Sequence, residues 1–344
     1  MNWDILQGDA KEVLSDLESE SAQTCVTSPP YWGLRDYGVE GQLGLEDSPE
    51  EYTQNLIEIF EEVHRVLTKD GTLWLNLGDC YTSGGRSTYD SDKKDTKDGR
   101  AGDSRPPQPS NLKEKDLVGI PWRVAFALQE KGWYLRSDII WRKTNPLPES
   151  VKDRPTSSHE HIFLLTKSPK YYYDYKAIKE PVKESSLKRA KRGRSANHKW
   201  SGSPSGQTEH TLNQPSEETA TTSPEGRNKR DVWDVATKPF PEAHFAVYPP
   251  DLIEPCILAG SAEGDTVLDP FAGAGTTGVV ALQHSRDFVG VELNPEYIDI
   301  ATTRIQNTLL DNQNVWDDEQ PDVNIEQPGD PTDDDSFGDY LNNL

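Results

Sequence analysis

The sequence predicts an α/β fold, in which a mostly parallel β-sheet carries helices on both of its faces. Short apolar segments of strand length alternate along the chain with longer segments whose apolar residues recur at helical spacing. Such alternation is typical of parallel sheets, because each helix returns the chain to the end where the next strand begins. A glycine-rich turn at 273–278 joins one such strand to one such helix. With 344 residues, the chain can form one large or two medium domains.

In the first half of the chain, the helix expected at 48–67 has a complete start signal. Ser48 can cap it, Pro49 opens its first turn, and Glu51 completes a capping box. A strand is expected before it, at 24–27. After it, the pattern predicts a strand at 71–77, a helix at 117–129, and strands at 133–141 and 161–166.

The second half repeats the alternation, with no internal repeat of fixed period. Helices are expected at 252–258, 276–283 and 295–305, and strands at 266–268 and 288–291.

Two polar stretches, 82–111 and 178–230, interrupt these elements, and their composition cannot bury much core. From Lys176 to Lys199 there are nine basic residues and two acids. This cluster favours a segment that becomes ordered on a polyanion, and a pair of solvated loops is the alternative.

The chain is strongly acidic, with 59 Asp and Glu against 36 Lys and Arg and a formal charge of −23. A tail at 311–344 holds eleven acids and no lysine or arginine, and is expected to be solvated and disordered. Residues 1–310 then carry a formal net charge of about −12. An acidic surface keeps a protein dissolved in concentrated salt, so a prokaryotic cytoplasm, that of a halophilic archaeon included, is one hypothesis. An ordinary acidic protein with an acidic tail is the other.

The composition argues against secreted, metal-binding and membrane proteins. The three cysteines, Cys25, Cys80 and Cys256, form neither a disulfide framework nor a paired zinc spacing, and no His/Cys/Asp cluster suggests a metal. No apolar run approaches the roughly 18–20 residues of a membrane span. The first residues include two acids, unlike a signal peptide. A cytoplasmic protein with no membrane partner is expected.

The glycine-rich turn predicts a nucleoside cofactor. Gly273, Gly275 and Gly278 form a G-x-G-x-x-G pattern directly after a strand and opening a helix. Glu292 ends the next strand, where a carboxylate can accept hydrogen bonds from both ribose hydroxyls. The glycine pattern alone also fits a plain strand–helix turn. The strand, the helix and the acid together favour the cofactor site.

The second motif, Ser28-Pro29-Pro30-Tyr31, follows a strand near the N-terminus. The Ser28 hydroxyl and the Pro29 carbonyl can each accept an N–H, Pro30 stiffens the turn, and Tyr31 offers a flat face to a planar base. Such a site suits the exocyclic amine of a nucleobase, whose lone pair is delocalised into the ring. Two acceptors that hold both N–H bonds would free that lone pair for attack. By itself the motif also fits a simple turn.

With these motifs, the chain resembles the DNA amino-methyltransferases, which methylate N4 of cytosine or N6 of adenine with S-adenosyl-L-methionine. The Asp269–Thr277 segment is similar to that family's cofactor motif and Ser28–Tyr31 to its catalytic motif, in the order of its β-type arrangement. The resemblance covers roughly 1–178 and 231–306. It implies the Rossmann-like fold of class I methyltransferases. It also implies a catalytic half at 1–177 with a flexible loop at 82–111, a target recognition insert at 178–230, and a cofactor-binding half at 231–310.

The resemblance also assigns roles to individual residues. The catalytic residues would be Ser28, Pro29, Pro30 and Tyr31. The cofactor would be bound by Asp9, His244, Asp269, Phe271, Gly273, Gly275, Thr276 and Glu292. DNA phosphates would be bound by Lys188, Arg189, Lys191 and Arg192. For Asp9 and His244, a turn acid and a packed histidine are the alternatives.

The expected substrate is a cytosine flipped out of double-stranded DNA, with N4 as the methyl acceptor, because a serine at the first motif position is commoner in N4-cytosine enzymes of this family. Adenine N6 is the alternative base. A short palindromic site is expected, with CTAG as one candidate, and a cognate restriction endonuclease is a possible partner. An RNA or protein methyltransferase and a non-catalytic DNA-binding module on the same fold are alternative functions, whereas the oligomeric state, monomer or dimer, is left open.

Overall fold

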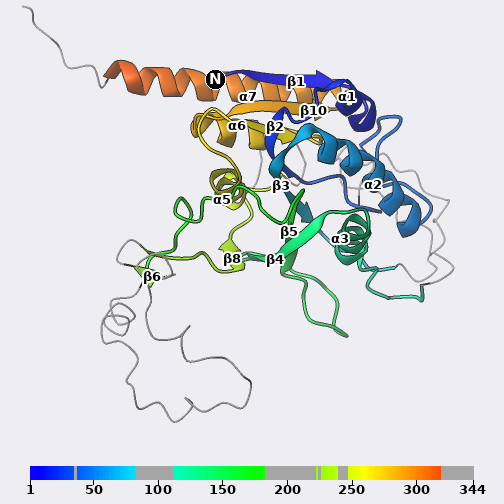
Figure 1. Ribbon diagram of the computed structural model, residues 1–344. Helices are drawn as coiled ribbons and strands as arrows, with labels where there is room; N and C mark the ends of the chain where they lie inside the picture. The colour runs from blue at the N-terminus through cyan, green and yellow to red at the C-terminus, as the bar shows by residue number, and fades with distance from the viewer. Residues whose placement is uncertain (35–36, 83–111, 183–221, 224–225, 239–246, 319–344) are drawn as a thin grey trace, which may run out of the picture.

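The computed structural model describes residues 1–344 except 35–36, 83–111, 183–221, 224–225, 239–246 and 319–344. Its centre is an eight-stranded sheet, mostly parallel, with helices on both faces (Figure 1). In spatial order the strands are β1 (Trp3–Gln7), β10 (Asp287–Glu292), β9 (Thr266–Asp269), β2 (Ala22–Thr27), β3 (Leu67–Leu77), β5 (His159–Thr166), β4 (Tyr134–Lys143) and β8 (Val232–Val235). A separate two-stranded sheet pairs β6 (Thr222–Ser223) with β7 (Gly226–Arg227). The fold class predicted from the sequence is therefore confirmed.

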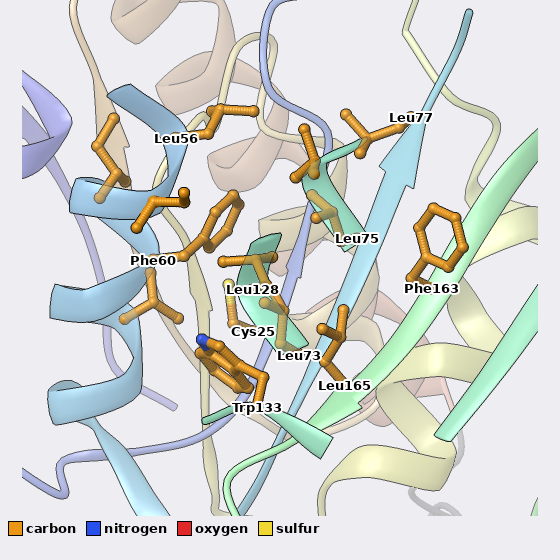
Figure 2. Close-up of a cluster of buried hydrophobic side chains, with 14 of the residues drawn as sticks. Cys25, Leu56, Phe60, Leu73, Leu75, Leu77, Leu128, Trp133, Phe163 and Leu165 are labelled. Atoms are coloured by element: carbon orange, nitrogen blue, oxygen red, sulfur yellow. The ribbon is translucent and has the colours of Figure 1, made fainter. Parts of the chain in front are cut away.

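One face of the sheet is covered by the helices of the first half of the chain. These helices are α1 (Ala10–Asp16), α2 (Pro49–Val66) and α3 (Ile120–Glu130). Figure 2 shows how Leu56 and Phe60 of α2 pack over Cys25 of β2 and Leu73 of β3. Phe60 is completely buried, and burying such a side chain stabilises the fold by about 1.5–3 kcal/mol.

The opposite face is covered by the helices of the second half. These are α5 (Pro250–Gly260), α6 (Thr276–Gln283) and α7 (Pro295–Asp318). Neighbouring residues on one strand belong to different cores, since Cys25 packs under α2 whereas Val26 packs with the α5 and α6 side chains. This alternation follows from the pleat of a strand, and explains why the central strands are apolar throughout.

The local signals predicted most elements closely. Ser48 caps α2 as expected, with its Oγ accepting from the Glu51 N–H at 3.1 Å, and Pro49 is the first helical residue. The helix at 276–283 has the predicted bounds. The last helix is longer than predicted, since α7 continues to Asp318 and crosses the expected start of the acidic tail.

Other elements were not anticipated. The sequence indicated neither β1 nor α1, whose segments are short, nor β8 at the sheet edge. Strand β5 runs antiparallel to both β3 and β4, because a loop and not a helix joins β4 to β5. Strand β8 pairs with β4, at the end of the sheet away from β9 and β10.

The ends of the predicted recognition insert meet at the body of the protein. Glu180 and Arg227 form an antiparallel bridge with backbone hydrogen bonds of 2.9 Å in both directions. The Glu180 carboxylate also pairs with Arg227 at 3.0 Å and Arg230 at 2.9 Å. These contacts hold the two described ends of the predicted insert together. Within the described residues, no helix combines the length and apolar character needed to cross a bilayer.

Candidate active site

The two sequence motifs meet where the strand order of the sheet reverses. Strands β9 and β2 are parallel neighbours, from which the chain proceeds outward to β10 on one side and to β3 on the other. Open α/β sheets form their binding crevices at such a point, outside the carboxyl ends of the strands. Ser28 directly follows β2, and the glycine loop directly follows β9. The topology thus brings together residues that lie 242 positions apart, as shown by the bond from the Thr27 hydroxyl to Asp269.

Asp269 connects the two motifs below the surface. Its side chain is 1% exposed and accepts hydrogen bonds from the Thr27 hydroxyl at 2.6 Å, the Thr277 hydroxyl at 2.5 Å and the Tyr248 hydroxyl at 3.1 Å. The Phe271 N–H donates to it at 3.1 Å. Burial raises the pKa of this carboxyl, and the hydrogen bonds act in the opposite direction. Asp269 therefore joins β2 to the glycine loop through protein contacts, and its predicted contact with a cofactor stays a prediction.

The three glycines of the loop are required for different reasons. Gly275 has a φ of +74°, and a Cβ there would lie 2.7 Å from the Ala301 Cβ of α7. A Cβ on Gly278 would lie 2.7 Å from the ring of Phe288 in β10. Gly273 has a φ of +52°, and among the described residues its Cβ would meet only the Phe271 carbonyl oxygen, at 3.9 Å. Gly275 and Gly278 thus allow close packing of helices and strand, whereas no described residue crowds Gly273.

We expect Gly275→Ala to lower the free energy of unfolding by about 1–3 kcal/mol, because it adds backbone strain and a clash with Ala301. Gly273→Ala adds only the strain of a positive φ, about 1 kcal/mol. Denaturant unfolding of both variants measures whether Gly275→Ala loses more unfolding free energy than Gly273→Ala. A larger loss at Gly273 than at Gly275 would contradict this explanation.

Glu292 lies under the glycine loop, at the end of β10. Its Oε2 accepts from the Gly273 N–H at 2.8 Å and its Oε1 from the Asn294 N–H at 2.8 Å. Burial raises the pKa of this carboxyl, and the charge of Asp269 adds to the effect. Each carboxylate oxygen has a second lone pair, so Glu292 can still accept two hydroxyl groups. A carboxylate held by the loop, with both oxygens still able to accept, fits the ribose of a nucleoside cofactor.

The remaining cofactor candidates are placed less directly. Asp9 caps α1, where its Oδ1 accepts from the Lys11 N–H at 2.9 Å and the Glu12 N–H at 3.1 Å. It lies near Glu292, because Gln7 pairs with Glu292 across β1 and β10. Thr276 is buried, and its hydroxyl accepts from Arg304 at 3.1 Å.

Four predicted phosphate ligands and one predicted cofactor ligand lie outside the described residues. They are Lys188, Arg189, Lys191, Arg192 and His244.

In the Ser28–Tyr31 turn, the carbonyls of Pro30 and Tyr31 are hydrogen-bonded, whereas those of Ser28 and Pro29 accept from no described residue. The Pro30 carbonyl accepts from the Tyr52 hydroxyl at 2.8 Å, and the Tyr31 carbonyl from the Leu34 N–H at 3.3 Å. No donor among the described residues reaches the Pro29 carbonyl. Ser28 Oγ donates to the Tyr31 hydroxyl at 3.3 Å, which leaves its lone pairs available. The turn therefore holds two acceptors next to each other in the chain, the Ser28 hydroxyl and the Pro29 carbonyl, and their predicted role in binding an amine stays a prediction.

Tyr31 is held at both its ring and its hydroxyl. The ring lies against Gly78, where a Cβ would be 2.5 Å from Tyr31 Cε2. The hydroxyl donates to Glu160 Oε2 at 2.8 Å, with Asn76 Oδ1 at 3.2 Å. Burial raises the pKa of the Tyr31 phenol well above its usual value, and the charge of Glu160 adds to this, so the hydroxyl keeps its proton.

The cysteine nearest to this turn in the sequence, Cys25, is not placed to act as a nucleophile. Cys25 is fully buried in β2, and burial raises the pKa of its thiol well above the usual value. A thiol that is not ionised is a poor nucleophile.

The sequence argument assigned no role to Asn76, Gly78, Lys143 or Glu160. The antiparallel course of β5 brings its first residues to the edge where β3 ends, since Leu77 pairs with His161. Strand β4 ends at the same edge, where Trp141 pairs with Glu160. The signals available in the sequence were an asparagine between leucines in β3 and the polar His159–Glu160 pair before an apolar strand. Both signals point to polar contacts, but neither identifies the partner.

Comparison with known sequences gives matches along most of the chain. A family model of N6- and N4-methyltransferases, described as DNA methylase, matches residues 22–303. The type II methyltransferase M.Cfr9I of Citrobacter freundii is 53% identical over 302 residues, covering 88% of this chain and 87% of that protein. The type II methyltransferase M.SmaI of Serratia marcescens is 49% identical over 301 residues, which cover 88% of this chain and 90% of that protein.

Two solved structures have a similar fold. The cytosine-N4-specific PvuII DNA methyltransferase has a TM-score of 0.57 and 17% identity, covering 92% of this chain and 93% of that one. A proposed DNA modification methylase of Thermus thermophilus, solved with S-adenosyl-L-methionine, has a TM-score of 0.53 and 24% identity, covering 90% and 96%. At these identities the likeness concerns the arrangement of the chain.

Proposed function

Because the chain belongs to the DNA methylase family of N6- and N4-methyltransferases, we propose that it methylates the exocyclic N4 of a flipped cytosine in duplex DNA. It is a type II DNA methyltransferase, and its methyl donor is S-adenosyl-L-methionine. The observation that carries the choice of an amine as acceptor is the Pro29 carbonyl, which accepts from no described residue, next to the Ser28 hydroxyl. Two acceptors in one turn match the two N–H bonds of an exocyclic amine.

The residues of the turn bind and orient the amine. The Ser28 hydroxyl and the Pro29 carbonyl each accept one N–H, which draws the nitrogen toward a tetrahedral geometry and localises its lone pair. The donor supplies an electrophilic methyl group on a sulfonium. The amine nitrogen forms a bond to the methyl carbon as the carbon–sulfur bond breaks, and the nitrogen then loses one proton to solvent. Orientation and exclusion of water are the contributions of the protein, and no covalent enzyme intermediate is required.

A base stacked in a duplex cannot reach this turn. The target therefore flips out, at a cost on the order of a few kcal/mol, and the ring of Tyr31 provides a surface for it. The fixed position of that ring against Gly78 supports this role, because a preorganised platform loses little entropy when the base arrives.

On the cofactor side, Glu292 would hold the ribose hydroxyls, and Phe271 and Gly273 would line the loop around the rest of the molecule. The hydrogen bonds to Glu292 from Gly273 and Asn294 support this assignment, since they fix both carboxylate oxygens. Asp9, His244, Asp269, Gly275 and Thr276 stay predicted cofactor contacts.

N4 of cytosine is proposed ahead of N6 of adenine because Ser28 occupies the first position of the motif. Both bases present an amine beside a ring nitrogen, so the two acceptors fit either one. Comparing nucleosides from treated DNA decides between them. Purified protein, labelled S-adenosyl-L-methionine and unmethylated DNA should give N4-methylcytosine, whereas N6-methyladenine would establish the alternative base. Label in RNA or in protein, with none in DNA, would overturn the assignment of DNA as substrate.

The basic residues of the insert are predicted to bind DNA phosphates. Replacing Lys188, Arg189, Lys191 and Arg192 together with glutamine should weaken DNA binding, most at low salt. The slope of log K against log salt should become less steep by up to about 3–4, at roughly 0.9 per phosphate contact. Cofactor affinity should stay the same. Binding of one duplex across a salt series measures this, and parallel lines for the two proteins would mean that these residues do not contact phosphates.

The biological setting is proposed by analogy. M.Cfr9I and M.SmaI are type II methyltransferases of bacteria, which supports a restriction–modification setting with a cognate endonuclease. The halophilic archaeal source inferred from the acidity stays a prediction, as does the oligomeric state.

A further inference from the structure

A chain of hydrogen bonds runs from Ser28 to a partly buried ion pair. Ser28 Oγ donates to the Tyr31 hydroxyl at 3.3 Å, and the Tyr31 hydroxyl donates to Glu160 Oε2 at 2.8 Å. The other oxygen of Glu160 accepts from Lys143 Nζ. The Glu160 and Lys143 side chains are 14% and 24% exposed. The pair thus lies mostly out of solvent, directly behind the residues that would bind the target amine.

The chemistry of these groups fixes which partner donates and which accepts along this series of hydrogen bonds. An ionised carboxylate only accepts hydrogen bonds, and the Tyr31 hydroxyl has a single hydrogen, whose acceptors are Glu160 Oε2 at 2.8 Å and, at the longer distance of 3.2 Å, Asn76 Oδ1. The Tyr31 oxygen can then only accept from Ser28. The hydrogen of Ser28 is therefore directed to the Tyr31 oxygen, and among the described residues both lone pairs of Ser28 Oγ remain for another donor. The amine of a nucleobase is such a donor.

We propose that Glu160 is a positioning residue for methyl transfer, which acts through Tyr31 to keep Ser28 in the acceptor state that the target amine requires. The inference rests on the proposed function. With the Ser28 hydrogen directed at the substrate instead, a hydroxyl hydrogen would face an amine hydrogen, and the lone pair of the nitrogen would not be localised. Aligned hydrogen bonds also polarise one another, which strengthens the acceptor at the end of the chain.

The surroundings of Glu160 suit this role. Asn76 Nδ2 donates to Glu160 Oε2 at 3.2 Å and to the His161 carbonyl at 3.1 Å. Besides Tyr31, the donors to Glu160 are thus Asn76 of β3 and Lys143 of β4, two strands of the same sheet, which hold the carboxylate beside the Tyr31 hydroxyl. Lys143 is itself placed above the ring of Trp141, 4.9 Å from its centre. The position of the charge is consequently set by strand register and not by a mobile loop.

A purely structural role for the Glu160–Lys143 pair predicts a different result. Loss of an ion pair that only stabilised the sheet edge would lower the melting temperature and disturb cofactor and DNA binding together. Loss of the hydrogen-bond direction would lower kcat, with binding and stability retained. Glu160→Gln separates the two, because glutamine has the same shape but can donate to Tyr31 through its amide, and so permits the reverse direction.

The experiment measures kcat, KM for DNA, Kd for S-adenosyl-L-methionine and Tm in wild type, Glu160→Gln, Tyr31→Phe and the double variant. We expect Glu160→Gln to lower kcat by about 10- to 100-fold, the loss typical of a hydrogen bond to a charged group, with KM and Kd changed less than about threefold. The double variant should be no slower than Tyr31→Phe, because both changes break the same chain. Glu160→Asp, which keeps the charge, should recover part of the rate. Glu254→Gln, in the surface pair with His284 at 2.9 Å, is the matched control and should behave as wild type.

An unchanged kcat in Glu160→Gln, or additive effects in the double variant, would overturn the inference. A fall in Tm together with weaker binding of both substrates, with kcat retained, would assign Glu160 a structural role and overturn it as well. If wild type transfers no methyl group to DNA, it is the proposed function that fails.

Discussion

Replacing Ser28 with alanine is expected to lower kcat by about 100- to 1,000-fold, with cofactor affinity unchanged. Ser28 supplies one of two acceptors to the amine, and the loss of a single preorganised hydrogen-bonding group from an active site typically costs this much. Cofactor binding should not change, because the described contacts of Glu292 and of the glycine loop do not include Ser28. Methyl transfer to DNA under saturating conditions and calorimetric titration with S-adenosyl-L-methionine measure the two quantities.

A serine in a neutral position provides the control for this substitution. Ser15 is exposed on α1, where its hydroxyl bonds to the Glu12 carbonyl of the same helix at 2.7 Å, so Ser15→Ala should retain full activity. Abolished cofactor binding in Ser28→Ala, with transfer at the normal rate, would reverse the assigned role. An unchanged kcat would show that the Pro29 carbonyl alone suffices to hold the amine.

Replacing Glu292 with alanine should weaken the binding of S-adenosyl-L-methionine by about 10- to 100-fold. The substitution removes the acceptor for the ribose hydroxyls, and a net loss of one hydrogen bond to a charged group, about 1.5–3 kcal/mol, corresponds to a change in Kd of this size. It also leaves the Gly273 and Asn294 N–H groups without their partner, which loosens the loop. Glu296→Ala, exposed at the start of α7, is the matched control. An unchanged Kd in Glu292→Ala would exclude the ribose role.

In the wild type, cofactor affinity should also decrease as the pH is lowered. Burial raises the pKa of the Glu292 carboxyl, so it takes up a proton at a higher pH than an exposed glutamate does. The protonated carboxyl has lost acceptor capacity, and the Kd for the cofactor should therefore rise as the pH is lowered through this pKa. Glutamine does not titrate. The Glu292→Gln variant should therefore bind the cofactor weakly, and its Kd should lack the pH dependence that Glu292 causes in the wild type. A Kd with the same pH dependence in both proteins would assign the effect to another group.

The sequence by itself determined the features whose signals lie within a few neighbouring residues. Ser48, Pro49 and Glu51 specify the start of α2, because a cap and its partner are three residues apart. The glycine loop and the Ser28–Tyr31 turn were likewise recognised from contiguous residues, and Glu292 from its place at the end of the next strand. The family resemblance depends on the same short segments, and the match over residues 22–303 confirms it.

Only the tertiary structure decided which residues stand behind those motifs. Tyr31 and Glu160 are 129 positions apart, and they meet because β5 runs antiparallel to β3 in a register that pairs Leu77 with His161. No local preference encodes that register, since it depends on how both faces of the whole sheet are packed under the helices. The same holds for Asp269, whose link to Thr27 requires β9 and β2 to be neighbours. Hydrogen bonds within a turn are fixed by the sequence around it, whereas those between strands are fixed by the order of the sheet.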